Sequence, residues 1–367
     1  MLRRRLFLGI LVLITLLAFY SGFNSSSVNW DIKEQQESVI RIELKREELV
    51  NREALEFDSS QIAALSLNNP MGDVEIIGED RDNICIDYKI VISYSDLEAA
   101  EKYLDQMDFR SEIVNRQLLI ENKHPSITPS GVMAARVHYL IKVPKEIDLV
   151  LNTSFGRMIV QDINGDLTVT LRYGKEDSKF ANLTGKNLLN LQYSTAEINN
   201  VDGKLNVNFA YSSLTVSNVT DRIVMNGTYS DLSLANINST VELQAKYGNI
   251  ALTNLTDSLK GELAYTGFTG SNLLGPIDLQ ATFSPINLTN IANSTQIKGS
   301  NSPINIKLDP ELGYQVNLDL KRAKLNSNLE LVASELNNVH NRYFGSYGDG
   351  QFPLEIESDN GHLLLYF

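Results

Sequence analysis

The chain has little of the chemistry that catalytic and metal sites use. Its 367 residues include one cysteine, Cys85, and four histidines, so an internal disulfide and a cysteine-based zinc site are excluded. The histidines share no ligand spacing: His124, His138, His340 and His362. No phosphate-binding glycine loop, nucleophile elbow or metalloprotease helix is present. The sequence therefore indicates no catalytic, cofactor-binding or metal-binding residue, no cofactor, and a protein that is not an enzyme.

Positive charge is also scarce. Lysine and arginine total 32 against 45 acidic residues, which gives a formal net charge of −13. Nucleic-acid-binding proteins present basic faces, so a nucleic-acid partner is not expected. An acidic domain is also repelled by anionic lipid, which fits a domain outside the cell that does not lie flat on a membrane.

The chain does contain a regular repeat. An aromatic residue, and finally an asparagine, recurs every 18 residues, with one interval of 20: Phe155, Tyr173, Tyr193, Tyr211, Tyr229, Tyr247, Tyr265, Phe283 and Asn301. A second series pairs Asn (Asp in the first pair) with an aliphatic residue at a matching period: Asp162-Ile163, Asn182-Leu183, Asn200-Val201, Asn218-Val219, Asn236-Ile237, Asn254-Leu255, Asn272-Leu273 and Asn290-Ile291. A fixed period of this size indicates a solenoid, whose repeats stack on one another.

One repeat, Tyr229 to Lys246, predicts the shape of a coil. Apolar residues alternate with polar ones in two stretches, the first with Leu232 and Leu234, the second with Val241, Leu243 and Ala245. Alternation with period two indicates strands with one buried face, and the Ser, Asp and Asn residues between them favour turns. Each coil is therefore expected to be strand, turn, strand, turn.

These observations predict an all-β protein, a single-stack β-solenoid with two-strand coils of about 18 residues that pair in parallel about 4.8 Å apart. In the second coil, two extra residues within Gly174–Ser178 are expected to form a loop outside the stack. A left-handed hexapeptide helix is the rival fold. It needs an aliphatic residue every six positions, and Ser213 and Asn249 break that rule.

The aromatic series has two readings. Exposed rings could stack on sugars, but Tyr247 shares its parity with the apolar Val241 and Leu243, so the rings are expected to point inward and pack on one another. The asparagines are expected to form an inward amide ladder. Many of them lie in Asn-x-Ser/Thr triplets, which we interpret as turn chemistry rather than as glycosylation sites.

The N-terminal region predicts three segments. Residues 1–23 carry three arginines and then an apolar run, which indicates a signal anchor or a signal peptide. Residues 24–59 are expected to be a polar spacer that contains either some helix or one strand at Val39–Leu44. Residues 60–150 are an N-terminal β cap with one short helix, 96–107, for which Ser95 and Glu98 suggest a capping box.

The strands of this cap are expected at five places: Ile62–Leu67, Asp73–Ile77, Ile84–Ile92, Leu118–Glu121 and Ala135–Val143. Cys85 is expected to be buried in the third of them, because Ile84 and Ile86 flank it. The repeats then fill 151–310.

Residues 311–367 are expected to form a C-terminal β cap. Tyr314–Leu320 and Leu329–Val332 have strand patterns. A last hairpin, Leu354–Glu357 with Leu363–Tyr366, is expected to turn at Asp359-Asn360-Gly361.

Four stretches resemble a known family: Asn69-Pro70-Met71-Gly72-Asp73-Val74-Glu75-Ile76, Val143-Pro144-Lys145, the Tyr-Gly or Tyr-Ser step of each coil, and Ser358-Asp359-Asn360-Gly361. Over Gln61–Phe367 the chain is similar to the bacterial putative-adhesin β-strand-repeat family of unknown function, with its adhesin-like head domain. The resemblance implies a β-solenoid in the cell envelope, often held at the membrane by one N-terminal segment. It carries over no functional residue.

Three functions remain open from the sequence. The first is a non-catalytic, adhesin-like interaction or scaffold protein whose polar solenoid face contacts an envelope protein or a cell-wall glycan. Its N-terminus would lie in the cytoplasm and its solenoid outside, or it would be secreted if residues 1–23 are cleaved. The second is a carbohydrate-active β-helical enzyme, although no column of acidic residues repeats from coil to coil. The third is an accessory of an envelope-stress sensing system.

Overall fold

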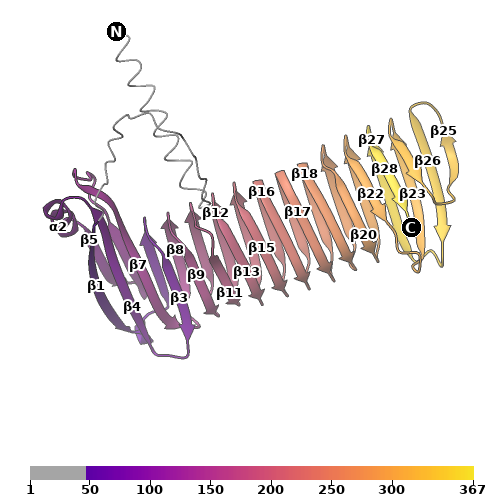
Figure 1. Cartoon of the computed structure of the whole chain (residues 1–367). Coiled ribbons are helices and arrows are strands. Elements are labelled where there is room, and N and C mark those ends of the chain that lie inside the picture. Colours follow the sequence, from indigo (N-terminus) through magenta and orange to yellow (C-terminus); the bar gives the residue numbers. More distant parts are fainter. Residues whose placement is uncertain (1–46) are drawn as a thin grey trace, which may run out of the picture. The chain divides into compact units, whose positions relative to one another are not determined.

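The computed structural model describes residues 47–367 (Figure 1). The predicted signal segment 1–23, the first part of the spacer and its strand at Val39–Leu44 lie outside the described residues. Within 47–367, 28 strands are joined by hydrogen bonds into one continuous set, with a single short α-helix. The prediction of an all-β solenoid is confirmed. The domain boundaries stay predictions.

Each coil of the repeat region contains two extended segments. In the middle of the stack the two segments of a coil are continuous and form one long strand: β16 (Ile223–Ile237), β17 (Val241–Leu255) and β18 (Leu259–Leu273). Elsewhere the coil is divided into β8 (Asp148–Ser154), β9 (Met158–Ile163), β10 (Leu167–Arg172), β11 (Ser178–Leu183), β12 (Lys186–Gln192), β13 (Thr195–Val201), β14 (Lys204–Ala210), β15 (Ser213–Val219), β19 (Ile277–Thr282), β20 (Ile286–Ile291), β21 (Thr295–Ser300) and β22 (Pro303–Lys307).

Parallel pairing between coils builds two walls. The first wall contains β8, β10, β12, β14, the first halves of β16 to β18, β19 and β21. The second wall contains β9, β11, β13, β15, the second halves of β16 to β18, β20 and β22. Each wall buries alternate side chains, so Leu243 and Leu252 are 2% and 1% exposed while Gln244 and Thr253 face solvent.

Small and large residues alternate along the core, as the sequence suggests. Gly227 lies in register with Phe209 on the neighbouring strand. A Cβ atom on Gly227 would lie 2.5 Å from Cζ of the Phe209 ring. The glycine therefore makes the room that this ring occupies.

Two left-handed residues turn the chain in every regular coil. The first is the aromatic residue and the second is the asparagine, as in Tyr247 (φ 59°) and Asn254 (φ 57°). A left-handed residue interrupts the alternation of a strand. Ala245 is buried whereas Tyr247, two residues later, is 42% exposed. The prediction that the rings point inward is therefore wrong, because parity does not carry across such a corner.

The extra residues of the second coil form the connection between β10 and β11, from Tyr173 to Asp177. The stack continues past them, since β11 still pairs in parallel with β9 and β13. The insertion is a loop that leaves the wall intact, as predicted.

The N-terminal elements are β1 (Glu47–Asp58), η1 (Ser59–Gln61), β2 (Ala64–Asn69), β3 (Val74–Glu79), β4 (Asn83–Tyr94), α2 (Leu97–Asp105), β5 (Asp108–Val114), β6 (Gln117–Lys123) and β7 (Val132–Pro144). β2 and β3 make a first coil that pairs in parallel with β8 and β9. β7 continues the second wall in parallel with β3, and β4 runs antiparallel to both β7 and β1, so this end of the wall contains one strand of opposite direction.

Three features of this region were not predicted. Glu47–Asp58, which lies within the predicted spacer 24–59, forms β1, whose polar sequence hides the strand pattern. β5, whose residues are exposed or partly exposed, was also missed. The helix is capped by Asp96, not Ser95: the Asp96 carboxylate accepts hydrogen bonds from the backbone N–H groups of Glu98 and Ala99.

The C-terminal elements are β23 (Tyr314–Lys321), β24 (Lys324–Ser327), β25 (Val332–Leu336), β26 (His340–Tyr347), β27 (Phe352–Asp359) and β28 (His362–Tyr366). β27 pairs in parallel with β21 and β23, and β28 pairs in parallel with β22 and β24. The last two strands of the chain therefore lie between strands that precede them in sequence (Figure 1).

The predicted terminal hairpin is consequently wrong. β27 and β28 are the two strands of one coil, and Asn360 (φ 56°) is its left-handed corner. The expected strand at Leu329–Val332 is also displaced, since β25 begins at Val332.

Candidate functional site

An exposed stack of aromatic rings follows the corner between the two walls. Its members are Phe155, Tyr173, Tyr193, Tyr211, Tyr229, Tyr247, Tyr265 and Phe283, and we call this set the aromatic ladder. Successive ring centroids are 4.6–5.1 Å apart and the planes are within 10° of parallel. Each ring is 42–51% exposed. Because each ring covers the next, the inner members offer solvent their edges and hydroxyls, not their faces.

This geometry closes the inner rings of the ladder to sugar stacking. A pyranose packs against the face of an aromatic ring, and a spacing of 4.6–5.1 Å leaves no room for a second ring in between. Binding on the ladder would have to use the row of tyrosine hydroxyls.

Small residues with a hydroxyl group follow many of the ladder's aromatic residues at the corner. The residue after each aromatic is often a buried serine, as in Ser212, which is 7% exposed. Its Oγ accepts the backbone N–H of Ser194 at 3.2 Å and donates to the carbonyl of Ala210 at 2.9 Å. The Tyr-Ser step is therefore explained by backbone hydrogen bonding at the corner.

The asparagine ladder exists, but it is exposed rather than inward. Each Nδ2 donates to the Oδ1 of the residue one coil before, for example Asn254 to Asn236 at 2.8 Å and Asn272 to Asn254 at 3.0 Å. The series begins on Asp162, which accepts from Asn182 at 2.8 Å. Both polar ends of most amides are occupied within the ladder, which indicates a structural role.

The outer face of the second wall is flat and almost uncharged from β15 to β20. Its outward side chains are Ser213, Thr215, Ser217, Asp231, Ser233, Ala235, Asn249, Ala251, Thr253, Gly267, Thr269, Ser271, Asn287 and Thr289. Asp231 is the one charged residue among them. In-register pairing aligns these side chains in rows, such as Thr215, Ser233, Ala251 and Thr269. We call these 14 residues the neutral face.

The outer face of the first wall is different. In β17 to β21 it carries Glu242, Lys246, Lys260, Glu262, Asp278 and Lys298. Because both faces belong to the same coils, the contrast in charge is a property of the side chains and not of the backbone.

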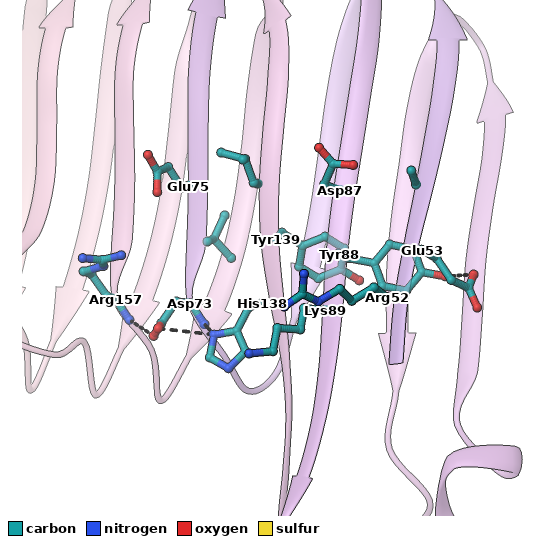
Figure 2. Close-up of a pocket in the computed structure, with 13 residues that line it drawn as sticks. Arg52, Glu53, Asp73, Glu75, Asp87, Tyr88, Lys89, His138, Tyr139 and Arg157 are labelled. Carbon is teal, nitrogen blue, oxygen red and sulfur yellow. Dashed lines mark hydrogen bonds and ion pairs between the residues drawn. The ribbon is translucent and has the colours of Figure 1, made fainter. Parts of the chain in front are cut away.

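A groove of about 580 Å³ lies on the N-terminal cap, over β1, β4, β7, β3 and the start of β9. Figure 2 shows two rows of side chains across these strands. One row holds Arg52, Lys89, His138, Asp73 and Arg157, and the other holds Asp87 and Glu75. Tyr88 and Tyr139 also line the groove, but they alternate with Lys89 and His138 along β4 and β7, so their rings lie on the inner side of the sheet and are 8% and 4% exposed.

Asp73 is the best-satisfied polar group of the groove. Its Oδ1 accepts the backbone N–H of Arg157 at 2.9 Å and lies 3.3 Å from Lys175 Nζ, while its Oδ2 lies 3.3 Å from His138 Nδ1. Burial alone would raise the pKa of Asp73, but the Arg157 N–H and the Lys175 and His138 charges outweigh it and lower that pKa. Burial is also the largest effect on His138, and it lowers the pKa of that imidazole.

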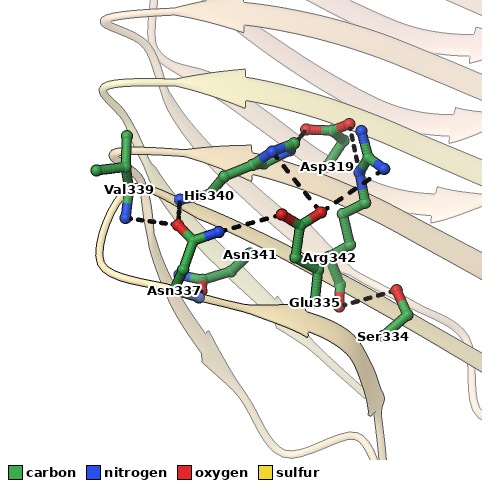
Figure 3. A network of polar contacts seen from close by, with 8 residues as sticks. All are labelled: Asp319, Ser334, Glu335, Asn337, Val339, His340, Asn341 and Arg342. Atoms are coloured by element: carbon green, nitrogen blue, oxygen red, sulfur yellow. Dashed lines mark hydrogen bonds and ion pairs between the residues drawn. The ribbon is translucent and has the colours of Figure 1, made fainter.

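A second polar network lies in the C-terminal cap, on β23, β25 and β26 (Figure 3). His340 Nε2 lies 2.6 Å from Asp319 Oδ1, and Arg342 Nε donates to Asp319 Oδ2 at 3.1 Å. Glu335 lies 3.7 Å from Arg342 and 3.9 Å from His340. Every member has a partner within the network, which ties β25 and β26 to β23.

The structure does not bring the histidines together. His138 lines the groove, His340 belongs to the C-terminal network, and His124 lies 3.3 Å from the Tyr103 hydroxyl. His362 lies on β28. Within residues 47–367, no three His, Cys, Asp or Glu side chains form a group that could hold a metal ion. No helix among the described residues is long and apolar enough to cross a membrane.

Cys85 is partly exposed, not buried as predicted. Ile84 and Ile86 point into the core, so the residue between them must face outward. Its Sγ accepts a hydrogen bond from Arg81 at 2.7 Å.

Sequence reasoning missed the groove and the C-terminal network. Their residues come from strands far apart in the chain, and no short motif links them. The neutral face was visible in part, because its Ser, Thr and Asn residues recur with the repeat.

No family model matches the chain, and no curated protein matches it. Among solved structures, the chain is similar to a "putative cell adhesion protein" from Clostridium sporogenes, at 11% identity over 87% of this chain and 99% of that one, with a TM-score of 0.20. It is also similar to a "putative lipid binding protein" from Parabacteroides distasonis (14% identity, 70% and 92% covered, TM-score 0.25) and a "putative adhesin" from Parabacteroides merdae (13%, 70% and 92%, 0.22).

Proposed function

We propose that this protein is a non-catalytic, adhesin-like interaction module of the cell envelope, and that the neutral face is its binding surface. The observation that supports this most is the composition of that face: one charged residue, Asp231, among 14 outward positions, in a chain with a formal net charge of −13. Exposed surfaces of soluble proteins normally mix both charges. A face kept neutral and flat over several coils suits a neutral partner.

The backbone geometry supports an extended partner. Strands β15 to β20 pair in register and in parallel, so equivalent side chains repeat at one strand spacing of about 4.8 Å. Repeat proteins use such surfaces to bind long partners through many weak contacts. The partner we propose is a cell-wall glycan strand or an extended segment of another envelope protein.

Three of the four wall ends among residues 47–367 carry antiparallel strands, which favours a discrete molecule. At the N-terminal end these are β4 in the second wall and β5 in the first, and at the C-terminal end of the first wall β26 runs antiparallel to β23 and β25, whereas the second wall ends there in the parallel strand β24. Such strands interrupt the parallel pattern that further coils would extend. Growth by end-to-end stacking is therefore not the proposed role of the neutral face.

The test is a binding assay with envelope material. Ser233→Arg combined with Thr269→Arg places two charges on the neutral face, and Gln244→Arg combined with Gln280→Arg places two charges on the first wall of the same region. All four positions are exposed. Co-sedimentation with insoluble envelope fractions is expected to weaken about tenfold or more in the first variant, because a neutral partner must desolvate the new charges. Equal loss in both variants, or binding that neither affects, would refute the proposal.

We also propose that residues 1–23 hold the protein in the membrane with the walls outside the cytoplasm. Arg3, Arg4 and Arg5 precede the apolar run and favour a cytoplasmic N-terminus. In a Cys85→Ala background, Ser233→Cys should react with a membrane-impermeant maleimide on intact spheroplasts. Labelling only after lysis would contradict this topology.

A further inference from the structure

The basic row of the groove contains an electrostatic conflict. Arg52 lies directly opposite Lys89 across the antiparallel pair β1–β4, and Lys89 lies directly opposite His138 across β4–β7. Like charges in directly opposite positions destabilise a sheet. The chain nevertheless places two permanent cations and an imidazole side by side on three adjacent strands.

The conflict is not relieved by neighbouring acids. Within residues 47–367, the side chains of Arg52, Lys89 and Arg157 take part in no ion pair and no side-chain hydrogen bond. Asp73, the acid within the row, already pairs with Lys175 and His138. Asp87 and Glu75 lie in the other row, two residues further along their strands, which is about 6.8 Å away.

The basic row runs perpendicular to the strands. It crosses β1, β4, β7, β3 and β9, five neighbouring strands, so its ends are about 19 Å apart at a strand spacing of about 4.8 Å. Because Lys175 pairs with Asp73, three cations in the row remain without an ion-pair partner among residues 47–367: Arg52 and Lys89 at one end and Arg157 at the other. The acidic row runs beside it and would keep an anion on the cationic side.

We propose that this groove binds a linear phosphate-bearing polymer that lies along the row, with Arg52, Lys89 and Arg157 contacting successive anionic groups. Guanidinium and ammonium groups are the usual protein partners of phosphate oxygens. A polymer fits better than a single headgroup or a free ion, because one phosphate cannot contact cations at both ends of a row about 19 Å long. The groove is separate from the neutral face. Its proposed partner is anionic, whereas the proposed partner of the neutral face is uncharged.

The experiment measures binding of fluorescent polyphosphate to the full chain in a neutral detergent by anisotropy, at several salt concentrations. Arg52→Gln with Lys89→Gln removes two charges from the row. Lys246→Gln with Lys260→Gln removes two charges from the outer face of the first wall, where both lysines are exposed and unpaired within the described residues. Inorganic phosphate and monomeric dihexanoyl phosphatidylglycerol are the competitors.

We expect the groove variant to lose at least tenfold in affinity and to show a shallower dependence of affinity on salt, because two phosphate contacts and their released counterions are gone. The control variant should bind within twofold of the natural protein. The groove variant should also unfold at an equal or higher denaturant concentration, since the like-charge contact is removed. That result separates loss of binding from loss of fold.

Three results would overturn the proposal. One is that polyphosphate does not bind the natural protein at low salt. Another is that both double variants lose the same affinity, which would make binding a general charge effect. The last is that phosphatidylglycerol or inorganic phosphate binds as tightly as the polymer and depends on the same residues, which would assign the groove to a single anionic group.

Discussion

Tyr229 and Tyr247 lie face to face, with ring centroids 4.6 Å apart and planes 6° from parallel, and both have a left-handed backbone, with φ of 52° and 59°. A left-handed conformation costs a residue other than glycine about 1–2 kcal/mol. Stacking of aromatic side chains contributes about 0.5–1.5 kcal/mol per pair beyond the area buried. The aromatic ladder therefore offsets the strain of the corners that join the two walls.

Removing one ring from the middle of the ladder should destabilise the protein. Tyr229→Ala loses two stacking contacts and keeps the strained corner, so we expect a loss of about 1–3 kcal/mol in the free energy of unfolding. Tyr229→Gly loses the same contacts but adopts the left-handed corner freely, and should be less destabilised than the alanine variant. Tyr229→Phe is the control, expected within about 0.5 kcal/mol. Urea denaturation followed by circular dichroism measures the free energy of unfolding of each variant. A glycine variant less stable than the alanine variant would show that the left-handed corner is not strained at Tyr229.

The two faces of one strand should respond very differently to charge. Leu243 is 2% exposed, so Leu243→Asp buries an unpaired carboxylate and should cost several kcal/mol, on the order of 3 or more. Glu242 is on the outer face but lies 2.5 Å from Arg222, so Gln244→Lys is the cleaner control. That control should change stability by less than about 0.5 kcal/mol. Equal melting temperatures for the two variants would show that the inner and outer faces are assigned wrongly.

Gly227 should not tolerate even one methyl group. A Cβ there meets the Phe209 ring at 2.5 Å, and the ring lies in a packed core. Gly227→Ala should cost about 1–3 kcal/mol through overpacking. Gly267→Ala is the matched control, because its nearest atom is the side-chain Oδ1 of exposed Asn249, which can move. Thermal unfolding of both variants tests the packing, and a fully stable Gly227→Ala would contradict it.

The C-terminal network should make stability depend on acid. Burial alone would raise the pKa of Asp319, but hydrogen bonds from His340 and Arg342 outweigh it and lower that pKa below the ordinary value. A carboxylate with a lowered folded-state pKa adds stability above its unfolded pKa of about 3.9, and the contribution disappears as the pH falls through the folded value. Asp319→Asn should therefore be less stable than the natural protein at pH 6, and the difference should shrink as the pH falls below the unfolded pKa of about 3.9. A difference that stays constant over this range would show that Asp319 does not act through its charge.

Several features of the fold could be predicted because they repeat. The period of 18 residues, the two strands of a coil and the buried positions such as Leu243 all follow from local alternation. The direction of the tyrosine rings could not be predicted in the same way. Alternation assumes extended backbone, and a single left-handed residue such as Tyr247 changes which side the following residues face.

The sequence alone thus determined the all-β class, the coil length and which strand positions are buried, because each depends on residues a few positions apart. Only the tertiary structure decided three further features. They are the pairing of β1 with β4, the insertion of β27 and β28 beside β21 and β22, and the cross-strand row of Arg52, Lys89 and His138. The physical reason is that strand pairing depends on hydrogen bonds between backbone groups, which every sequence supplies alike. The choice among distant partners is made by the packing of the whole stack.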